Sequence, residues 1–276
     1  MNFLYPSFDT GFGFAFVENP NSGNPDLGPE TSNTAIAGIV LTPGFVPNLS
    51  LSVDYYRTVV NDRIGQIPAQ NALNLCYTDP TQTHEACSLI TRDASDNLTI
   101  IRRPIFNTGG IKTDGLEIDA SYNFGVENLG INDPGRITLS GQTTYLLRYL
   151  EQIVEGGDVL EWAGVIGRPK VRTNLSASYS GHDWTLGWTA RLISGAHIAN
   201  QLNTVPPTQP LQETPWMHYH NVFVQKDFDT SAGAAAVTFG INNLFDQDAP
   251  YVFGESDFAT YDPIGRYFFL KATLEM

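Results

Sequence analysis

Residues 170–193 read KVRTNLSASYSGHDWTLGWTARLI, and this stretch decides the fold. Apolar and polar side chains alternate along 170–179, three residues follow, and the alternation resumes along 183–193. A period of two residues is typical of a β-strand with two different faces, and a short connection joins antiparallel neighbours. The stretch therefore predicts two long antiparallel strands, each with one apolar and one polar face.

The same alternation recurs along the chain and predicts an all-β protein, because no segment shows comparable helical periodicity. Most of the expected strands run 9 to 14 residues. Strands of soluble sheets average about 5–6 residues, whereas a tilted strand that crosses a bilayer needs about 9–11. We expect nine strands, at 33–42, 49–60, 111–123, 136–149, 170–179, 183–193, 216–228, 235–243 and 264–275.

The connections between these strands alternate between short and long. Their lengths are 6, 50, 12, 20, 3, 22, 6 and 20 residues. An antiparallel up-and-down transmembrane β-barrel has this pattern, with short periplasmic turns and long outer loops, whereas a soluble sandwich has no reason for it. The polar strand faces would line a lumen, and the apolar faces would meet lipid. The aromatic residues expected in interfacial girdles are Tyr145, Tyr149, Trp184, Trp216, Tyr219 and Tyr267.

Composition excludes several classes of protein. The 276 residues include 15 Lys and Arg against 29 Asp and Glu, a net charge of −14, which argues against nucleic-acid binding. The aromatic content of 12% argues against a disordered acidic tail. No apolar run is long enough for a transmembrane helix, and no signal peptide opens the chain. Either the protein is cytosolic or an N-terminal part is missing.

The negative charge lies in the N-terminal segment and the long connections between the expected strands. Residues 1–32 carry −4, and the connections 61–110, 150–169, 194–215 and 244–263 carry −1, −3, −1 and −5, so strands and short turns together are neutral. The acidity therefore belongs to the outer rim of the expected barrel. Acidic loops attract cations or divalent-bridged lipopolysaccharide, although solvation of exposed loops is a sufficient reason for their charge.

Four short motifs, in the same order along the chain, resemble those of TonB-dependent outer-membrane receptors. They are NPDLGPETS at 24–32, NTGG at 107–110 continued by TDGLEI at 113–118, NNLFD at 242–246 and YDPIGRYF at 261–268. We assign structural roles to their residues: Asn24, Pro25, Leu27, Pro29, Glu30, Asn107, Gly109, Gly110, Gly115, Glu117, Asn243, Leu244, Phe245, Asp262, Gly265 and Arg266. Gly109 and Gly110, for example, would permit positive φ where a long loop rejoins a strand.

This resemblance implies a receptor with a plug domain followed by a barrel of about 22 strands. Residues 1–276 would be the C-terminal portion of that barrel, and the plug, the TonB box and the signal peptide would be absent. Such receptors lie in the outer membrane of Gram-negative bacteria, among its lipid and lipopolysaccharide. They bind a scarce nutrient (a ferric siderophore, cobalamin or an oligosaccharide) and import it with energy supplied by the partner TonB. The chain departs from the family by ending in Met276 rather than in an aromatic residue.

Two other functions stay open on the sequence alone. One is a passive porin-like or adhesin barrel, and the other is a secreted soluble β-protein. We expect no enzyme, cofactor or metal, because no catalytic or nucleotide-binding motif is found. His218 and His220 share a strand face, and on a lumen face they would be polar lining more often than ligands. Glu117 and Asp119 also share a face, and we expect them to pair with Arg or Lys of a neighbouring strand.

The 61–110 connection is the best candidate for ligand recognition, because loops on rigid scaffolds carry recognition. Arg92, Arg102 and Arg103 in its returning arm are candidate ligand contacts. Cys76 and Cys87 lie in a polar stretch of this loop, which favours a disulfide in an oxidising compartment, and two free thiols are the alternative.

Overall fold

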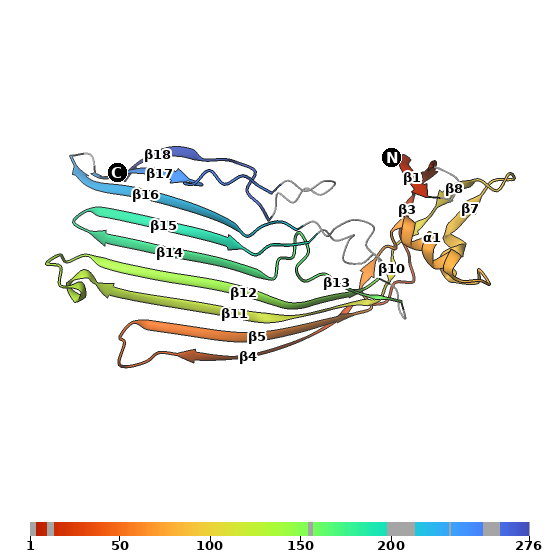
Figure 1. The fold of residues 1–276 in the computed structure, drawn as a ribbon, viewed down its shortest axis with the longest axis horizontal. Helices are drawn as coiled ribbons and strands as arrows, with labels where there is room; N and C mark the ends of the chain where they lie inside the picture. Colours follow the sequence, from red (N-terminus) through yellow and green to blue (C-terminus); the bar gives the residue numbers. More distant parts are fainter. Residues whose placement is uncertain are drawn as a thin grey trace. The chain divides into compact units, whose positions relative to one another are not determined.

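The computed structural model describes residues 4–9, 14–153, 157–197, 213–231, 233–250 and 260–275. Its main feature is a ten-stranded sheet in which nine long strands follow one another in chain order (Figure 1). The tenth, β13 (Val159–Glu161), pairs only with β12. The long strands are β4 (Thr31–Leu41), β5 (Leu49–Asn61), β11 (Gly110–Gly125), β12 (Arg136–Gln152), β14 (Val171–Gly181), β15 (Trp184–Ile193), β16 (Met217–Thr230), β17 (Gly233–Asn242) and β18 (Tyr267–Glu275).

All nine predicted strands are confirmed, with ends that shift by a few residues. β14 and β15 pair from Arg172 with Ile193 to Gly181 with Trp184. Their connection is shorter than expected, since only His182 and Asp183 lie outside the strands, and both have positive φ (49° and 61°). Positive φ at both central positions is typical of the type I′ turn, whose twist matches that of the flanking strands.

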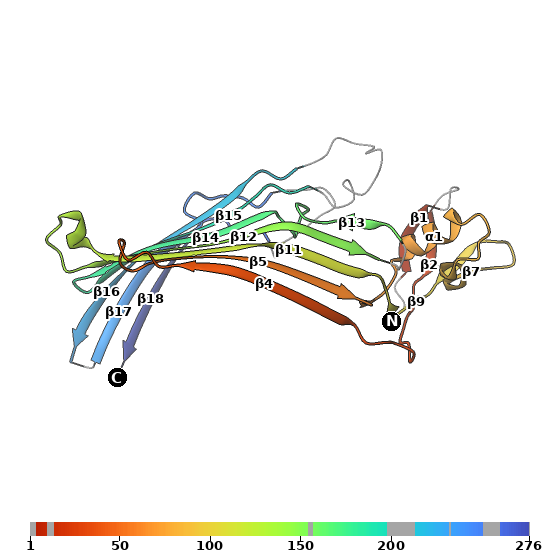
Figure 2. The same cartoon turned by 90° about the horizontal axis from the view of Figure 1, so that it is seen from below.

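Short and long connections alternate as the sequence predicts. The short ones are 42–48, 126–135, 182–183 and the link between Thr230 and Gly233, and these strand ends lie together at one end of the sheet (Figure 1). The longest of these turns contains a 3-10 helix, Val126–Leu129. The sheet is not closed, because β4 and β18 are its outermost strands, and it twists progressively from one to the other (Figure 2).

The two faces of the sheet differ in polarity. Trp188, Val222, Ile241 and Phe268 lie opposite one another on successive strands and form a row on the apolar face. Large apolar side chains of this face are exposed, and Leu270 reaches 73% exposure. A soluble protein rarely exposes so continuous an apolar surface, whereas a lipid-facing barrel wall requires one. Within the described residues, no helix is both long and apolar enough to cross a membrane.

A second compact unit comprises residues 1–33, 59–111 and 151–160. Its core joins Val17, Leu73, Leu98 and Ile101 with Ile67 and two buried alanines. A four-stranded sheet of order β1-β2-β8-β7 forms its framework. Its elements are β1 (Leu4–Asp9), β2 (Phe14–Glu18), β3 (Asn21–Ser22), β6 (Ile64–Gly65), α1 (Ala69–Thr78), a 3-10 helix (Glu85–Leu89), β7 (Ile90–Arg92), β8 (Leu98–Ile101), β9 (Arg103–Pro104) and β10 (Phe106–Asn107).

The expectation that 61–110 is a loop without helix is wrong. Helix α1 buries Ala69, Ala72, Leu73 and Cys76, which recur at the spacing of one helix face. Three of these four side chains are small, so the periodic signal is weak in the sequence. Cys76 is joined to Cys87 by a disulfide, which ties α1 to the following 3-10 helix.

Candidate functional site

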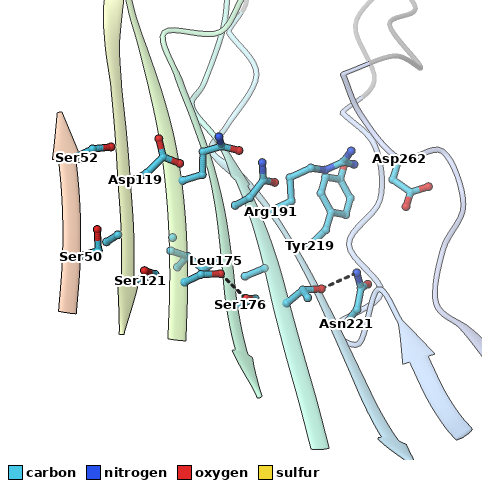
Figure 3. Close-up of a pocket in the computed structure, with 17 residues that line it drawn as sticks. Ser50, Ser52, Asp119, Ser121, Leu175, Ser176, Arg191, Tyr219, Asn221 and Asp262 are labelled. Carbon is cyan, nitrogen blue, oxygen red and sulfur yellow. Dashed lines mark hydrogen bonds between the residues drawn. The ribbon is translucent and has the colours of Figure 1, made fainter. Parts of the chain in front are cut away.

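The polar face of the sheet contains a hollow of about 760 Å³ (Figure 3). Strands β5, β11, β12, β14, β15 and β16 contribute to its wall, because the alternation along each strand places its small polar side chains on this face. Its lining includes Ser140, Gln142, Asn174, Ser176, Thr189, Asn221, Asp119, Arg191, Tyr219 and Asp262.

Uncharged hydrogen-bonding groups dominate the wall of this hollow. The hydroxyls of Ser140 and Ser176 lie 2.7 Å apart across β12 and β14. Asn221 on β16 donates to the Thr189 hydroxyl on β15 at 3.2 Å (Figure 3). Such groups both donate and accept hydrogen bonds, so the hollow presents a hydrated, polar and largely neutral surface.

Among the described residues that line the hollow, Arg191 is the one cation, and it accompanies the carboxylates of Asp119 and Asp262. Its guanidinium lies 4.8 Å from the centre of the Tyr219 ring, in cation–π geometry (Figure 3). Tyr219 is 3% exposed. The expectation that Tyr219 belongs to an interfacial girdle is therefore wrong, because its position opposite Arg191 puts it on the polar face.

Two further expectations about the sheet are wrong: that Glu117 and Asp119 pair with Arg or Lys of a neighbouring strand, and that His218 and His220 are polar lining of a lumen. In the described part of the chain, Glu117 and Asp119 have no ion-pair partner. His220 lies on the apolar face, where Trp188 donates to its Nδ1 at 3.2 Å and Phe245 contacts its ring edge-on. No group of three potential metal ligands occurs among the residues described.

The first and second family-like motifs meet through Asn107. Its Oδ1 accepts from the Gly28 N–H at 2.8 Å, and its Nδ2 donates to the carbonyls of Gly28 at 3.0 Å and of Asp62 at 2.8 Å. Glu30 accepts from the Ile64 N–H at 3.0 Å. Asn24 closes a local turn by accepting from the Asp26 N–H at 2.9 Å. The segment that contains Pro25, Leu27 and Pro29 is therefore held to both ends of the 62–109 connection.

The glycines of the second motif allow neighbouring groups to approach the backbone closely. A side chain on Gly109 would overlap the Gln152 carbonyl, and one on Gly110 would overlap the Val60 carbonyl. Gly115 similarly leaves room for the Tyr56 hydroxyl. The expected positive φ at Gly109 and Gly110 is wrong, since the positive-φ glycines of the described chain lie elsewhere.

The third and fourth motifs meet through Asn243, which is 2% exposed. Its side chain exchanges hydrogen bonds with Gln247 (N–H to Oδ1 2.8 Å, Nδ2 to carbonyl 2.9 Å) and donates to the Ile264 carbonyl at 3.3 Å. Arg266 donates its N–H to Asp246 at 2.7 Å, and Gly265 leaves room for that carboxylate. Three neighbours complete the junction: Leu244 donates to the His220 carbonyl, Phe245 packs on the His220 ring, and Asp262 accepts from the Ile264 N–H.

The three arginines proposed as ligand contacts are not brought into one site. Arg92 forms an ion pair with Asp96 (3.7 Å) and hydrogen bonds to the Tyr77 hydroxyl. Arg102 donates to the Thr91 hydroxyl at 3.0 Å. Arg103 lies in β9, and its Nε is buried without a partner in the described structure.

The structure reveals two charged features that no motif in the sequence indicates. Asp114 in β11 is 2% exposed, and Arg148 in β12 binds it through two bonds of 2.7 and 3.0 Å. Between the cysteines, Asp79 accepts hydrogen bonds from Thr81, Thr83 and His84. The hydroxyl and N–H of Thr81, with smaller contributions from the N–H groups of His84 and Thr83, hold the pKa of Asp79 well below its ordinary value.

Comparison of the sequence with models of known protein families gives one match. A family model described as TonB dependent receptor-like, beta-barrel, matches residues 2–244. A comparison with curated proteins gives no match.

Solved structures with a similar fold are receptors and transporters by their names. A mutant of the ferric enterobactin receptor PfeA from Pseudomonas aeruginosa shares 17% identity with a TM-score of 0.60, over 92% of this chain and 32% of that one. The siderophore receptor PirA from Acinetobacter baumannii shares 15% identity with a TM-score of 0.60, over 94% of this chain and 33% of that one. The FrpB iron transporter from Neisseria meningitidis shares 13% identity with a TM-score of 0.54, over 91% of this chain and 32% of that one. The chain thus spans about a third of the length of these structures.

Proposed function

Because the chain belongs to the TonB-dependent receptor β-barrel family, we propose that it is part of the wall of an outer-membrane receptor that imports a scarce nutrient. The observation that carries this proposal is the family match over residues 2–244. An exposed apolar face and a polar hollow on the opposite face support it, since a receptor wall must meet lipid on one side and water on the other.

We further propose that residues 1–276 are the C-terminal portion of a larger barrel. The chain spans about a third of the structures it resembles, and in the described part of the chain the outermost strands β4 and β18 each pair on one side alone. Unpaired strand edges are unstable in a bilayer, so further strands must close this sheet. A plug domain and a TonB-contacting segment would then belong to the rest of the receptor, and the nine strands by themselves would not transport.

The test compares cells that carry the gene with cells that lack it, under iron limitation. We expect uptake of a radioiron-labelled ferric siderophore only in cells with the gene, and we expect loss of that uptake when a protonophore collapses the inner-membrane gradient or when TonB is deleted. Outer-membrane fractionation of the same cells should recover the chain with the membrane.

The same experiment separates the alternatives. Uptake that continues without TonB and without the proton gradient would identify a passive porin-like barrel. Recovery of the chain as a detergent-free soluble monomer would contradict a membrane barrel of any kind. Neither alternative has a specific supporting observation in the structure.

A further inference from the structure

We propose that the outward face of β5, β11 and β12 binds the phosphate groups of a lipopolysaccharide through a cationic patch formed by Arg57, Lys112 and Arg148. The outward face is the face of the sheet opposite the polar hollow, and the three strands are neighbours in it (Figure 1). This inference rests on the proposed function, which places the sheet in the outer membrane with its long connections outside, and it adds a site for one lipid.

The alternation of side chains along β5 and β11 places two of these cations on the outward face. Ser52 of β5 lines the hollow, so Arg57, five positions later, lies on the opposite face. Asp119 of β11 also lines the hollow, so Lys112 and Asp114, an odd number of positions earlier, lie on the outward face as well.

The carboxylate of Asp114 draws the patch together. Arg148 of β12 binds it through two bonds of 2.7 and 3.0 Å, so its guanidinium lies on the same face. The Tyr55 hydroxyl donates to Asp114 at 3.4 Å, and Arg57 is close enough to interact with this carboxylate electrostatically. Lys112 is two residues from Asp114 on the same strand, so their side chains leave the outward face roughly 7 Å apart.

The charged residues begin where the apolar part of the outward face ends. From Leu116 to Phe124, every outward residue of β11 is apolar or aromatic. Residues 115–125 match the about 9–11 residues that a tilted strand needs to cross a bilayer, so Asp114 and Lys112 lie at the level of the outer headgroups. Lipid phosphates occupy the same level.

The positive charge is local and opposes the charge of the whole chain. Arg57, Lys112, Arg148 and Asp114 together carry +2, whereas the chain carries −14. The next strands, β14 and β15, have Val171 and Leu192 near their outer ends on the outward face. A general rule that strand ends are charged therefore does not explain the patch.

The cations of the patch have donors to spare. Arg57 is exposed, and neither Arg57 nor Lys112 forms an ion pair among the described residues. Arg148 uses its Nε and Nη2 atoms on Asp114, which orients the guanidinium, and its side chain is 49% exposed. Arg and Lys groups that converge in this way bind phosphate by charge-assisted hydrogen bonds. A phosphate monoester, with up to two negative charges, matches the +2 of the patch.

The test measures binding of fluorescently labelled lipopolysaccharide with a doubly phosphorylated lipid A to the intact receptor, purified in detergent from outer membranes. The variant is Arg57→Gln combined with Lys112→Gln, which leaves the ion pair of Arg148 with Asp114 in place. We expect the variant to bind at least about tenfold more weakly at low salt, and we expect the difference to shrink at high salt. Enzymatically dephosphorylated lipopolysaccharide should bind the parent as weakly as the intact lipid binds the variant.

The matched control is Lys226→Gln, because Lys226 is also on the outward face but at the opposite end, where it pairs with Trp184. Its affinity for lipopolysaccharide should equal that of the parent. Equal affinities of the parent and the double variant, or an equal loss in Lys226→Gln, would overturn the inference. Binding of phosphatidylglycerol to the parent as tight as that of lipopolysaccharide would overturn the choice of lipid. Absence of the parent protein from the outer membrane would instead contradict the proposed function.

Discussion

Asn107 and Gly28 exchange two hydrogen bonds although they lie 79 residues apart in the chain. The side-chain amide of Asn107 binds both the N–H and the carbonyl of Gly28, as a strand neighbour would, and it also binds the Asp62 carbonyl. One side chain thereby connects the segment before β4 with the segment before β11. The two sequence motifs that contain these residues are thus parts of one junction.

We expect Asn107→Ala to loosen this junction. The variant removes three hydrogen bonds to backbone groups, two of them partly buried, and each such loss typically costs about 0.5–1.5 kcal/mol. Hydrogen exchange followed by mass spectrometry should show faster exchange at 62–66 and 26–30. Asn132→Ala in an exposed turn is the control, because the Asn132 side chain has no hydrogen bond among those described. Equal exchange in the two variants would contradict the role of Asn107.

The glycines next to Asn107 give a second prediction. Gly109→Ala and Gly110→Ala would each push a methyl group into a backbone carbonyl, of Gln152 and Val60 respectively. Overpacking of this kind costs typically about 1–3 kcal/mol, and here a backbone atom must move. We expect both variants to lower the denaturation midpoint.

Gly23→Ala and Gly44→Ala are the matched controls, because a methyl group at either position meets nothing within 4 Å. Their midpoints should stay close to that of the parent protein. A loss of stability in the controls as large as in Gly109→Ala would show that removal of a glycine, and not the overlap with a carbonyl, is responsible.

The sequence predicts the sheet well because the alternation that marks each strand can be recognised within that strand alone. Alternation along 170–193 defines two strands and their faces without reference to any other part of the chain, and β14 and β15 follow it closely. The sequence does not predict helix α1, because Ala69, Ala72 and Cys76 form a buried stripe that is too weakly hydrophobic to be recognised. Small apolar residues become informative only when the surface they pack against is known.

The site is less predictable, because it depends on register between strands. Tyr219 and His220 are neighbours in sequence, and only the pairing with Arg191 and Ala190 shows which of them lies on the polar face. The ion pair of Asp114 with Arg148 likewise joins two strands whose relative register no local pattern defines. A shift of one residue would exchange the two faces of each strand.

Acid should destabilise the disulfide-closed loop through Asp79. Hydrogen bonds from Thr81, His84 and Thr83 lower the pKa of Asp79 below its ordinary value of 3.8. The carboxylate therefore stabilises the folded loop at pH values above about 3.8, and this contribution is lost as the pH falls further towards the folded-state pKa. Asp79→Asn should remove the contribution at every pH.

The measurement is hydrogen exchange at 79–91, corrected for intrinsic rates, in the parent and in Asp79→Asn. The difference in protection between them should be constant from about pH 7 to about pH 4 and should shrink below that value. Thr81→Ala, which removes the largest cause of the shift, should move the loss to higher pH. A difference between parent and Asp79→Asn that persists unchanged into acid would contradict this account.

Asn243 combines a backbone and a side-chain requirement, and two substitutions separate them. Its φ is 49°, in the left-handed region, and its buried amide binds Gln247 and Ile264. Asn243→Gly keeps the backbone freedom and loses the hydrogen bonds, at a cost of about 1–3 kcal/mol. Asn243→Ala loses both, and the left-handed backbone adds about 1 kcal/mol.

Guanidinium denaturation in detergent, followed by tryptophan fluorescence, reports on this junction, since all four tryptophans lie within 161–276. The expected order of midpoints is parent, then Asn243→Gly, then Asn243→Ala. A glycine variant as stable as the parent would show that the amide network contributes nothing. Equal midpoints for the two variants would show that the left-handed backbone is not the reason for asparagine at this position, and the hydrogen bonds to Gln247 and Ile264 would then account for the whole effect.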